Sequence, residues 1–172
     1  MLVSRRDFAF GCATAFALAM LAACSNSHGR GDTQPSASAL PSNQQEGAPY
    51  PADMEHLDQI LSLKGGQTLP EGAHVVSIRP ATNFARVFPG GWGYIIAFTA
   101  TDSSIRDYVT ERTGNPGELI ERYPEALKVE GGLEDIDLRD ISNPWNCGLG
   151  QANVLLERPL GRGWLVIRGG PR

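Results

Sequence analysis

Tyr94-Ile95-Ile96-Ala97-Phe98-Thr99 is the stretch of this 172-residue chain whose residue types favour a β-strand most strongly. It combines aromatic and β-branched side chains, which suit a pleated, buried surface. Apolar residues fall on both faces of the expected strand, as is typical of a central strand covered on both sides. Dense turn-forming sequence, Pro89-Gly90-Gly91-Trp92-Gly93, precedes it. We therefore expect the fold to be organised around a strand at 93–99.

Further strands are expected before and after this one. The first ends at a proline, Pro80, and the last two form a hairpin around the turn at 159–163. A hairpin is also expected between residues 84–88 and the central strand. Outside the short strand at 136–139, the segment 125–150 lacks periodicity and is expected to be mostly loop. The predicted strands cover residues 74–79, 84–88, 93–99, 136–139, 153–158 and 164–168.

Three helices are expected from apolar spacing and capping residues. The first runs from Met54 to Lys64, with Asp53 as its N-cap and Gly65-Gly66 as its end. The second follows the capping sequence Thr101-Asp102-Ser103-Ser104 and ends at Gly114, and the third starts at Asn115-Pro116-Gly117-Glu118. This order of elements predicts an α+β fold, a small antiparallel sheet with helices packed on one face.

The N-terminus has the composition of an export signal. Arg5 and Arg6 precede an uncharged run of 16 residues, Phe8 to Ala23. As a helix this run would span about 24 Å, short of the roughly 30 Å of a bilayer core. A basic start, an apolar middle and small residues at the end favour a cleaved signal peptide, residues 1–23.

Two resemblances sharpen this interpretation. The sequence Leu21-Ala22-Ala23-Cys24 resembles a bacterial lipobox, which implies that Cys24 carries a diacylglyceryl thioether and acyl chains such as palmitate. Ser4-Arg5-Arg6-Asp7-Phe8 resembles the twin-arginine export motif, although Ala9 and Phe10 depart from it. The implied location is the extracytoplasmic face of the cell membrane, with the membrane contacted through the lipid anchor.

A tether and one domain are expected after the signal. Residues 24–49 are rich in small and polar residues and predict a disordered, lipid-anchored tether. Residues 50–172 predict a single α+β domain. The patterning over 74–168 loosely resembles uncharacterised small lipoproteins of high-GC Gram-positive bacteria, a group that implies no activity for this chain.

Charge and cysteine content narrow the function classes. Removal of the signal leaves 13 basic and 18 acidic side chains, a net charge of −5, which argues against nucleic-acid binding. It also leaves no basic patch for anionic lipid, so that the anchor is expected to hold the protein alone. Cys147 is the one cysteine left unmodified; a small buried side chain, an intermolecular bridge and a reactive thiol remain open alternatives.

Catalytic and metal-binding patterns are weak. His74 and Cys147 could form a nucleophilic dyad only if the fold brought them together. The acidic stretch Glu134-Asp135-Asp137-Asp140 lacks the spacing of a calcium loop, and no paired Cys or His-x-x-x-His occurs. No phosphate-binding or dinucleotide motif is present, so no cofactor and no metal are expected and catalysis is not favoured.

Two tryptophans beside turns, Trp92 and Trp145, are the candidate binding residues, because loop aromatics can stack on sugars or anchor partners. The sequence therefore predicts a non-catalytic binding domain for a protein, a wall component or a small ligand. An accessory subunit of an envelope complex and a hydrolase with an unrecognised site are the alternatives.

Overall fold

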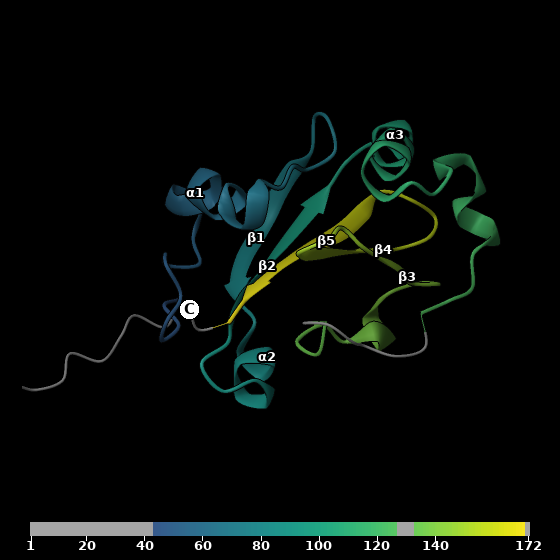
Figure 1. The fold of residues 1–172 in the computed structure, drawn as a ribbon. Coiled ribbons are helices and arrows are strands. Elements are labelled where there is room, and N and C mark those ends of the chain that lie inside the picture. Colours follow the sequence, from purple (N-terminus) through teal and green to yellow (C-terminus); the bar gives the residue numbers. More distant parts are fainter. Residues whose placement is uncertain (1–42, 127–132, 171–172) are drawn as a thin grey trace, which may run out of the picture. The chain divides into compact units, whose positions relative to one another are not determined.

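A computed structural model describes residues 43–126 and 133–170 of the chain. Its core is a five-stranded antiparallel sheet with the order β1-β2-β5-β4-β3 (Figure 1). The sheet and its helices make a small α+β fold, as the sequence predicts. The strands are β1 (His74–Pro80), β2 (Trp92–Thr99), β3 (Trp145–Gly148), β4 (Ala152–Leu156) and β5 (Arg162–Gly169).

The predicted central strand, β2, lies between β1 and β5 and is paired along its whole length with β5. Its side chains alternate between the two faces of the sheet. Tyr94, Ile96 and Phe98 enter one apolar cluster, whereas Ile95 enters the other. All four side chains are almost completely buried, which explains why the sequence is apolar at both odd and even positions.

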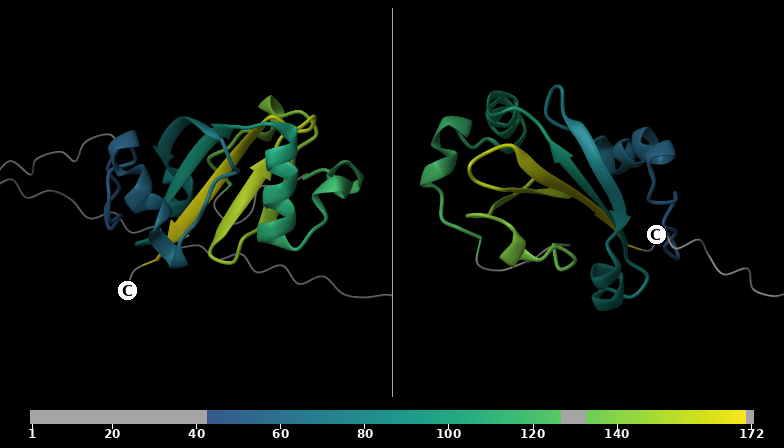
Figure 2. Two further views of the ribbon diagram at one scale, coloured as in Figure 1. Left: turned by 90° about the horizontal axis from the view of Figure 1, so that it is seen from above. Right: turned by 180° about the vertical axis from the view of Figure 1, so that it is seen from behind.

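Helices cover the first face of the sheet, the one that carries Tyr94, Ile96 and Phe98. The N-terminal helical turns comprise η1 (Met54–His56), α1 (Leu57–Leu61) and η2 (Leu63–Gly65), and the second group comprises α3 (Asp102–Thr113) and η3 (Gly117–Arg122). Figure 2 shows α3 alongside the sheet in both views. Ile60 from α1, with Ile105 and Val109 from α3, packs into the first cluster.

The predicted N-caps of the first two helices are confirmed, whereas Pro116, predicted as a first helical residue, is the N-cap of η3. Thr101 Oγ1 accepts a hydrogen bond from Ser104 N at 3.2 Å at the start of α3, and Gly114 ends the helix with φ of 71°. The side chain of Asp53 accepts from His56 N at 3.1 Å at the first turn. Local sequence is therefore sufficient to place these ends.

The second face is covered mainly by irregular chain. Ile95, Leu155 and Val166 of the sheet pack against Leu133, Ile136 and Ile141, with Phe84 at the margin. Only short helices take part, namely η4 (Leu138–Asp140) and α2 (Thr82–Val87), which projects beyond the lower end of the sheet in Figure 1. The helical cover of the sheet thus lies chiefly on one face.

Two sequence predictions are wrong. Residues 84–87 belong to helix α2 and Phe88 is its C-cap, so that this segment is not a strand, and the antiparallel partner of β2 on this side is β1. The cause is a tertiary contact, since the carboxylate of Asp135 accepts from the backbone N–H of Asn83 at 2.9 Å and of Phe84 at 3.3 Å. A negative charge at these free donors stabilises a helix start.

The second error concerns the segment before β3. Residues 136–139 form no strand and lead into η4, where Asp137 Oδ1 accepts from Arg139 N at 3.0 Å. The strand lies later, at β3, where Trp145 to Gly148 pair with β4. The aspartate side chain competes for the backbone donors that a strand would need.

Arg158, which is 4% exposed, fastens the loop after β4 to two distant segments. Its guanidinium donates to the carbonyl oxygens of Ile120 and Tyr123, each at 2.7 Å, and to those of the Asn143 backbone and side chain at 2.8 and 2.6 Å. Four oxygen acceptors compensate the desolvation of this buried cation.

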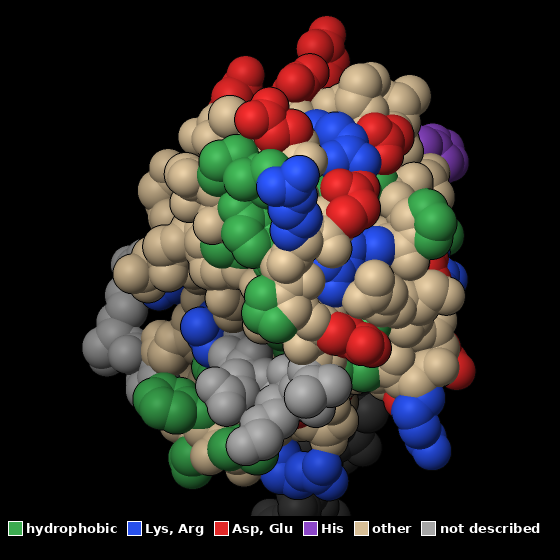
Figure 3. Space-filling view, turned by 90° about the vertical axis from the view of Figure 1, so that its right-hand side faces the viewer, with side chains coloured by type: hydrophobic (Ala, Val, Ile, Leu, Met, Phe, Trp, Pro, Cys, Tyr) green, Lys and Arg blue, Asp and Glu red, His purple; other side chains and the backbone are tan. Residues whose placement is uncertain are grey.

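The α3–η3 side is a charged surface. Acidic and basic side chains are interleaved on the face shown in Figure 3. Arg106 donates to both Asp102 and Glu121, and these contacts lower the pKa of Glu121 and raise the pKa of Arg106. Such exposed pairs contribute little to stability, so this surface is best understood as solvated.

Candidate binding site

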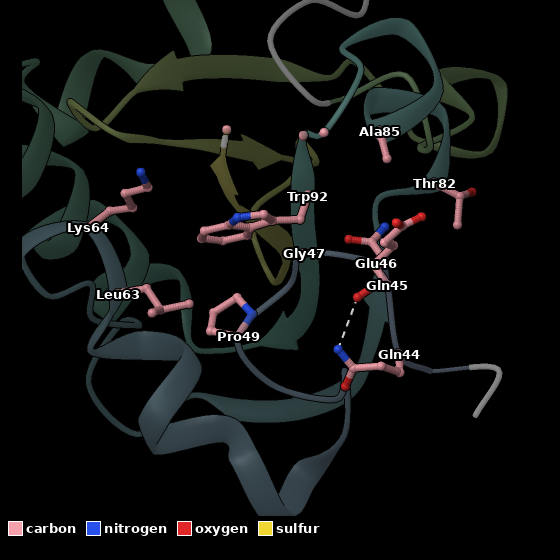
Figure 4. A pocket seen from close by; sticks show the side chains of 13 residues that line it. Gln44, Gln45, Glu46, Gly47, Pro49, Leu63, Lys64, Thr82, Ala85 and Trp92 are labelled. Carbon is pink, nitrogen blue, oxygen red and sulfur yellow. Dashed lines mark hydrogen bonds between the residues drawn. The ribbon is translucent and has the colours of Figure 1, made fainter. Parts of the chain in front are cut away.

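A pocket of about 1020 Å³ lies where the start of the described chain passes the turn between α2 and β2 (Figure 4). Its volume is at the upper end of the range typical of small-molecule sites. Five segments meet in it: the N-terminal segment, η2, α2 with the following turn, the start of β2, and the residue after β5. The lining residues are Gln44, Gln45, Glu46, Gly47, Pro49, Leu63, Lys64, Thr82, Ala85, Gly90, Gly91, Trp92 and Gly170.

Residues 43–49, which the sequence analysis assigns to the tether, pack on the domain. Gln45 Oε1 accepts from Gly93 N at 2.9 Å, and Asn43 O accepts from Ala52 N at 2.7 Å. Gln44 Nε2 donates to the carbonyl oxygens of Gln45 and Ala48, both at 3.0 Å. These bonds fix the segment as one wall of the pocket.

Trp92, a predicted binding residue, lines this pocket. It begins β2 and is not a loop residue, because the Gly-Gly turn ends immediately before it. Its ring lies 5.8 Å from the Tyr94 ring and stands over Gly169, its partner in the register of β5. Only 8% of the residue is exposed, so the indole presents a limited part of its surface to the pocket.

Lys64 is the cation of the site. Its Nζ lies 5.5 Å from the centroid of the Trp92 ring, within range of a cation–π contact. The backbone of Lys64 is left-handed, with φ of 55° and ψ of 41°, a conformation that is unfavourable for a side chain with a Cβ. In Figure 4, Pro49 lies on the other side of the indole. The fold therefore holds an ammonium group over an aromatic ring despite a conformational cost.

Gln45 supplies an unused donor. Because Oε1 accepts from Gly93 N, the orientation of the amide is set, and the buried Nε2 has no hydrogen-bond partner among the residues described. Unpaired buried donors are uncommon in native proteins and are costly. Because this nitrogen is itself buried, a ligand oxygen would reach it only if the Gln45 side chain moved.

Trp145, the other predicted binding residue, lies elsewhere. It begins β3, an edge strand that is separated from β2 by β5 and β4. It is 6% exposed, and its ring stacks on that of Tyr123 at a centroid distance of 5.5 Å. The two tryptophans do not converge on one groove, and Trp145 serves the core.

The possible dyad of His74 and Cys147 is excluded by the sheet order. His74 is on β1 and Cys147 on β3, the two edges of the sheet, about 19 Å apart at four interstrand spacings. Cys147 Sγ accepts from Asn115 Nδ2 at 3.2 Å and packs partly against the first apolar cluster. His74 is exposed at the start of its strand.

The acidic stretch is used within the fold. Asp135 caps α2, and Asp137 pairs with Arg139, which lowers the pKa of Asp137 to about 2. Within residues 43–126 and 133–170, no three His, Cys, Asp or Glu side chains converge as a metal site would require. No helix in these same ranges is long and apolar enough to cross a membrane.

The signal residues Arg5, Arg6, Leu21, Ala22 and Ala23 and the predicted lipidation residue Cys24 lie outside the described residues.

Comparisons with known proteins add no family to this picture. No protein-family model matches the chain, and no curated protein or solved structure is significantly similar to it. The chemistry of the site must therefore be inferred from its residues. Among those that line the pocket there are one amine, one carboxylate, one hydroxyl and two side-chain amides, and no His or Cys.

Proposed function

We propose that this chain is an exported lipoprotein whose folded domain binds a small ligand in the pocket beside Trp92. Cys24 would carry the lipid, and the domain would work at the extracytoplasmic face of the cell membrane. The observation that carries the binding proposal is the pairing of Lys64 with the Trp92 ring inside a pocket. Strained backbone conformations of this kind concentrate at ligand sites.

The lining favours a ring-shaped polar ligand. Trp92, Pro49 and Leu63 offer apolar surface, whereas the Lys64 ammonium offers hydrogen-bond donors. A sugar unit combines an apolar ring face with hydroxyl oxygens, and therefore uses both parts of the lining. A wall saccharide is accordingly the best-fitting ligand. A concave pocket also suits a small ligand better than it suits the surface of a protein partner.

Titration of the mature protein with a soluble disaccharide–peptide fragment of cell wall tests the binding proposal. Calorimetry should detect binding in the wild type and a loss of at least about tenfold in Lys64→Met, which keeps the alkyl chain and removes the donor. Trp145→Phe is the matched control and should bind like the wild type. Binding that is absent, or equally sensitive to both variants, would refute the site.

The anchor rests on the lipobox resemblance of Leu21-Ala22-Ala23-Cys24. Labelled fatty acid should enter the wild-type protein and not the Cys24→Ala variant, which should also leave the membrane fraction. Failure of the label to enter the wild type would contradict this part of the proposal alone.

A further inference from the structure

The end of α2 forms an apolar protrusion. Val87 is 70% exposed and Phe88 is 53% exposed, and the two are adjacent in sequence. The Phe88 ring stacks on that of Phe84, with centroids 5.9 Å apart and planes 6° from parallel. Phe88 O also accepts from Gly91 N at 2.7 Å. The ring stack and this backbone bond thus connect the protrusion to α2 and to the turn that follows it.

Basic side chains lie at the end of α2, and the exposed Glu46 is the carboxylate that lines the adjoining pocket. Residues 81–101 contain no Asp or Glu, and Arg86 is exposed within α2. The guanidinium of Arg168 lies 5.9 Å from the Phe84 ring. Asp135 binds the opposite end of the helix, where it satisfies the first N–H groups. The segment 81–101 is therefore basic, although the net charge of the whole chain is negative.

The chain that leads to the predicted anchor enters the domain beside this tip. Gln44 to Gly47 line the same pocket as Thr82 and Ala85 of α2, and a Cβ on Gly47 would lie 3.9 Å from Gly90 O. Eighteen residues separate Cys24 from Asn43. The coil that their composition predicts would span about 23 Å, which is short enough to bring this end of the domain to the bilayer.

We propose that the tip of α2 docks on the bilayer that carries the lipid anchor. Val87 and Phe88 would enter the boundary between headgroups and acyl chains, while Arg86 would contact lipid phosphates. The inference rests on the lipid anchor of the proposed function. It adds an orientation, because the turn that carries the tip also forms a wall of the Trp92 pocket and so places that pocket next to the membrane.

The test uses mature, lipidated protein in vesicles of mixed neutral and anionic phospholipid. A fluorophore is attached at Val87→Cys, in a Cys147→Ser background, and quenched by brominated lipid. Val76→Cys is the matched control, since Val76 is also an exposed valine, at 61%, but lies on the edge strand β1. Quenching at position 87 should exceed that at position 76 several-fold. Changing Phe88 to Ser should lower the equilibrium constant for docking of the tip by about tenfold, the factor expected when one large apolar side chain is no longer buried.

The possible outcomes distinguish a failure of membrane docking from a failure of the lipid anchor. Vesicle-bound protein with equal quenching at both positions overturns the docking inference and leaves the anchor intact. Protein that carries no lipid and does not associate with vesicles overturns both. A tip that stays unquenched and instead crosslinks to an envelope protein identifies a protein partner, and likewise refutes membrane docking.

Discussion

Changing Gly169 to Ala should disturb the Trp92 side of the pocket selectively. A Cβ built at Gly169 would lie 2.2 Å from Cζ2 and 2.5 Å from Cε2 of the Trp92 ring. Ordinary carbon contacts are about 3.5–4.0 Å, so the ring or the strand must move by more than about 1 Å. Overpacking of this size costs about 1–3 kcal/mol. For a domain of this length the melting temperature should fall by roughly 4–12 °C.

Thermal melts followed by circular dichroism measure this change, and two further variants make it interpretable. Gly161→Ala is the matched control, because nothing lies within 4 Å of its added Cβ and its stability should hardly change. In a Trp92→Leu background the cost of Gly169→Ala should largely vanish, since the clashing ring is absent. The coupling in this double-mutant cycle should be about 1–3 kcal/mol. Equal costs in both backgrounds would show that the Trp92 ring does not stand over Gly169.

Three further predictions concern single side chains. Arg158→Met should lower the free energy of unfolding by about 3–5 kcal/mol in urea titrations, because four buried or part-buried oxygens lose their donor. Arg139→Met, at an exposed pair, should change it by less than about 1 kcal/mol. Burial raises the pKa of Tyr108 to about 12, so the folded state keeps a proton that the unfolded state releases above pH 10, and stability should fall between pH 10 and 12. Tyr108→Phe should weaken that fall and gain up to about 1 kcal/mol at neutral pH, since the hydroxyl is buried without a partner among the described residues. Lys64→Gly should change stability by less than about 1 kcal/mol, as relief of the left-handed backbone offsets the lost cation–π contact, yet it should abolish saccharide binding in calorimetry.

The parts of the fold that the sequence predicts correctly are those with local causes. The apolar run of β2, the Thr101 cap of α3 and the turn between β4 and β5 can each be identified within about ten residues. The errors have distant causes. The sequence of residues 84–88 predicts a strand. In the structure, Asp135, some fifty residues later, caps this segment at its start as helix α2. The strand β3 depends on its pairing with β4, and the types of its four residues do not predict that pairing.

The site was predictable only in part. Trp92 is identifiable from its type and its Gly-rich surroundings, but Trp145 has the same features and is a core residue stacked on Tyr123. Lys64 carries a faint signal, since Gly65-Gly66 after it marks a tight left-handed turn. Nothing in the sequence indicates Gln45, because its role depends on a tertiary bond to Gly93. Which polar groups face a pocket is decided by packing between elements.

The most direct test of the binding site is the nuclear magnetic resonance signal of the tryptophan indole N–H groups during titration with the wall fragment. Trp92, Trp145 and Trp164 should give three separate signals. The proposal predicts a saturable shift of the Trp92 signal, lost in Lys64→Met, with the Trp145 and Trp164 signals unchanged. A shift confined to Trp145 or Trp164, or no shift at saturating fragment, would contradict it.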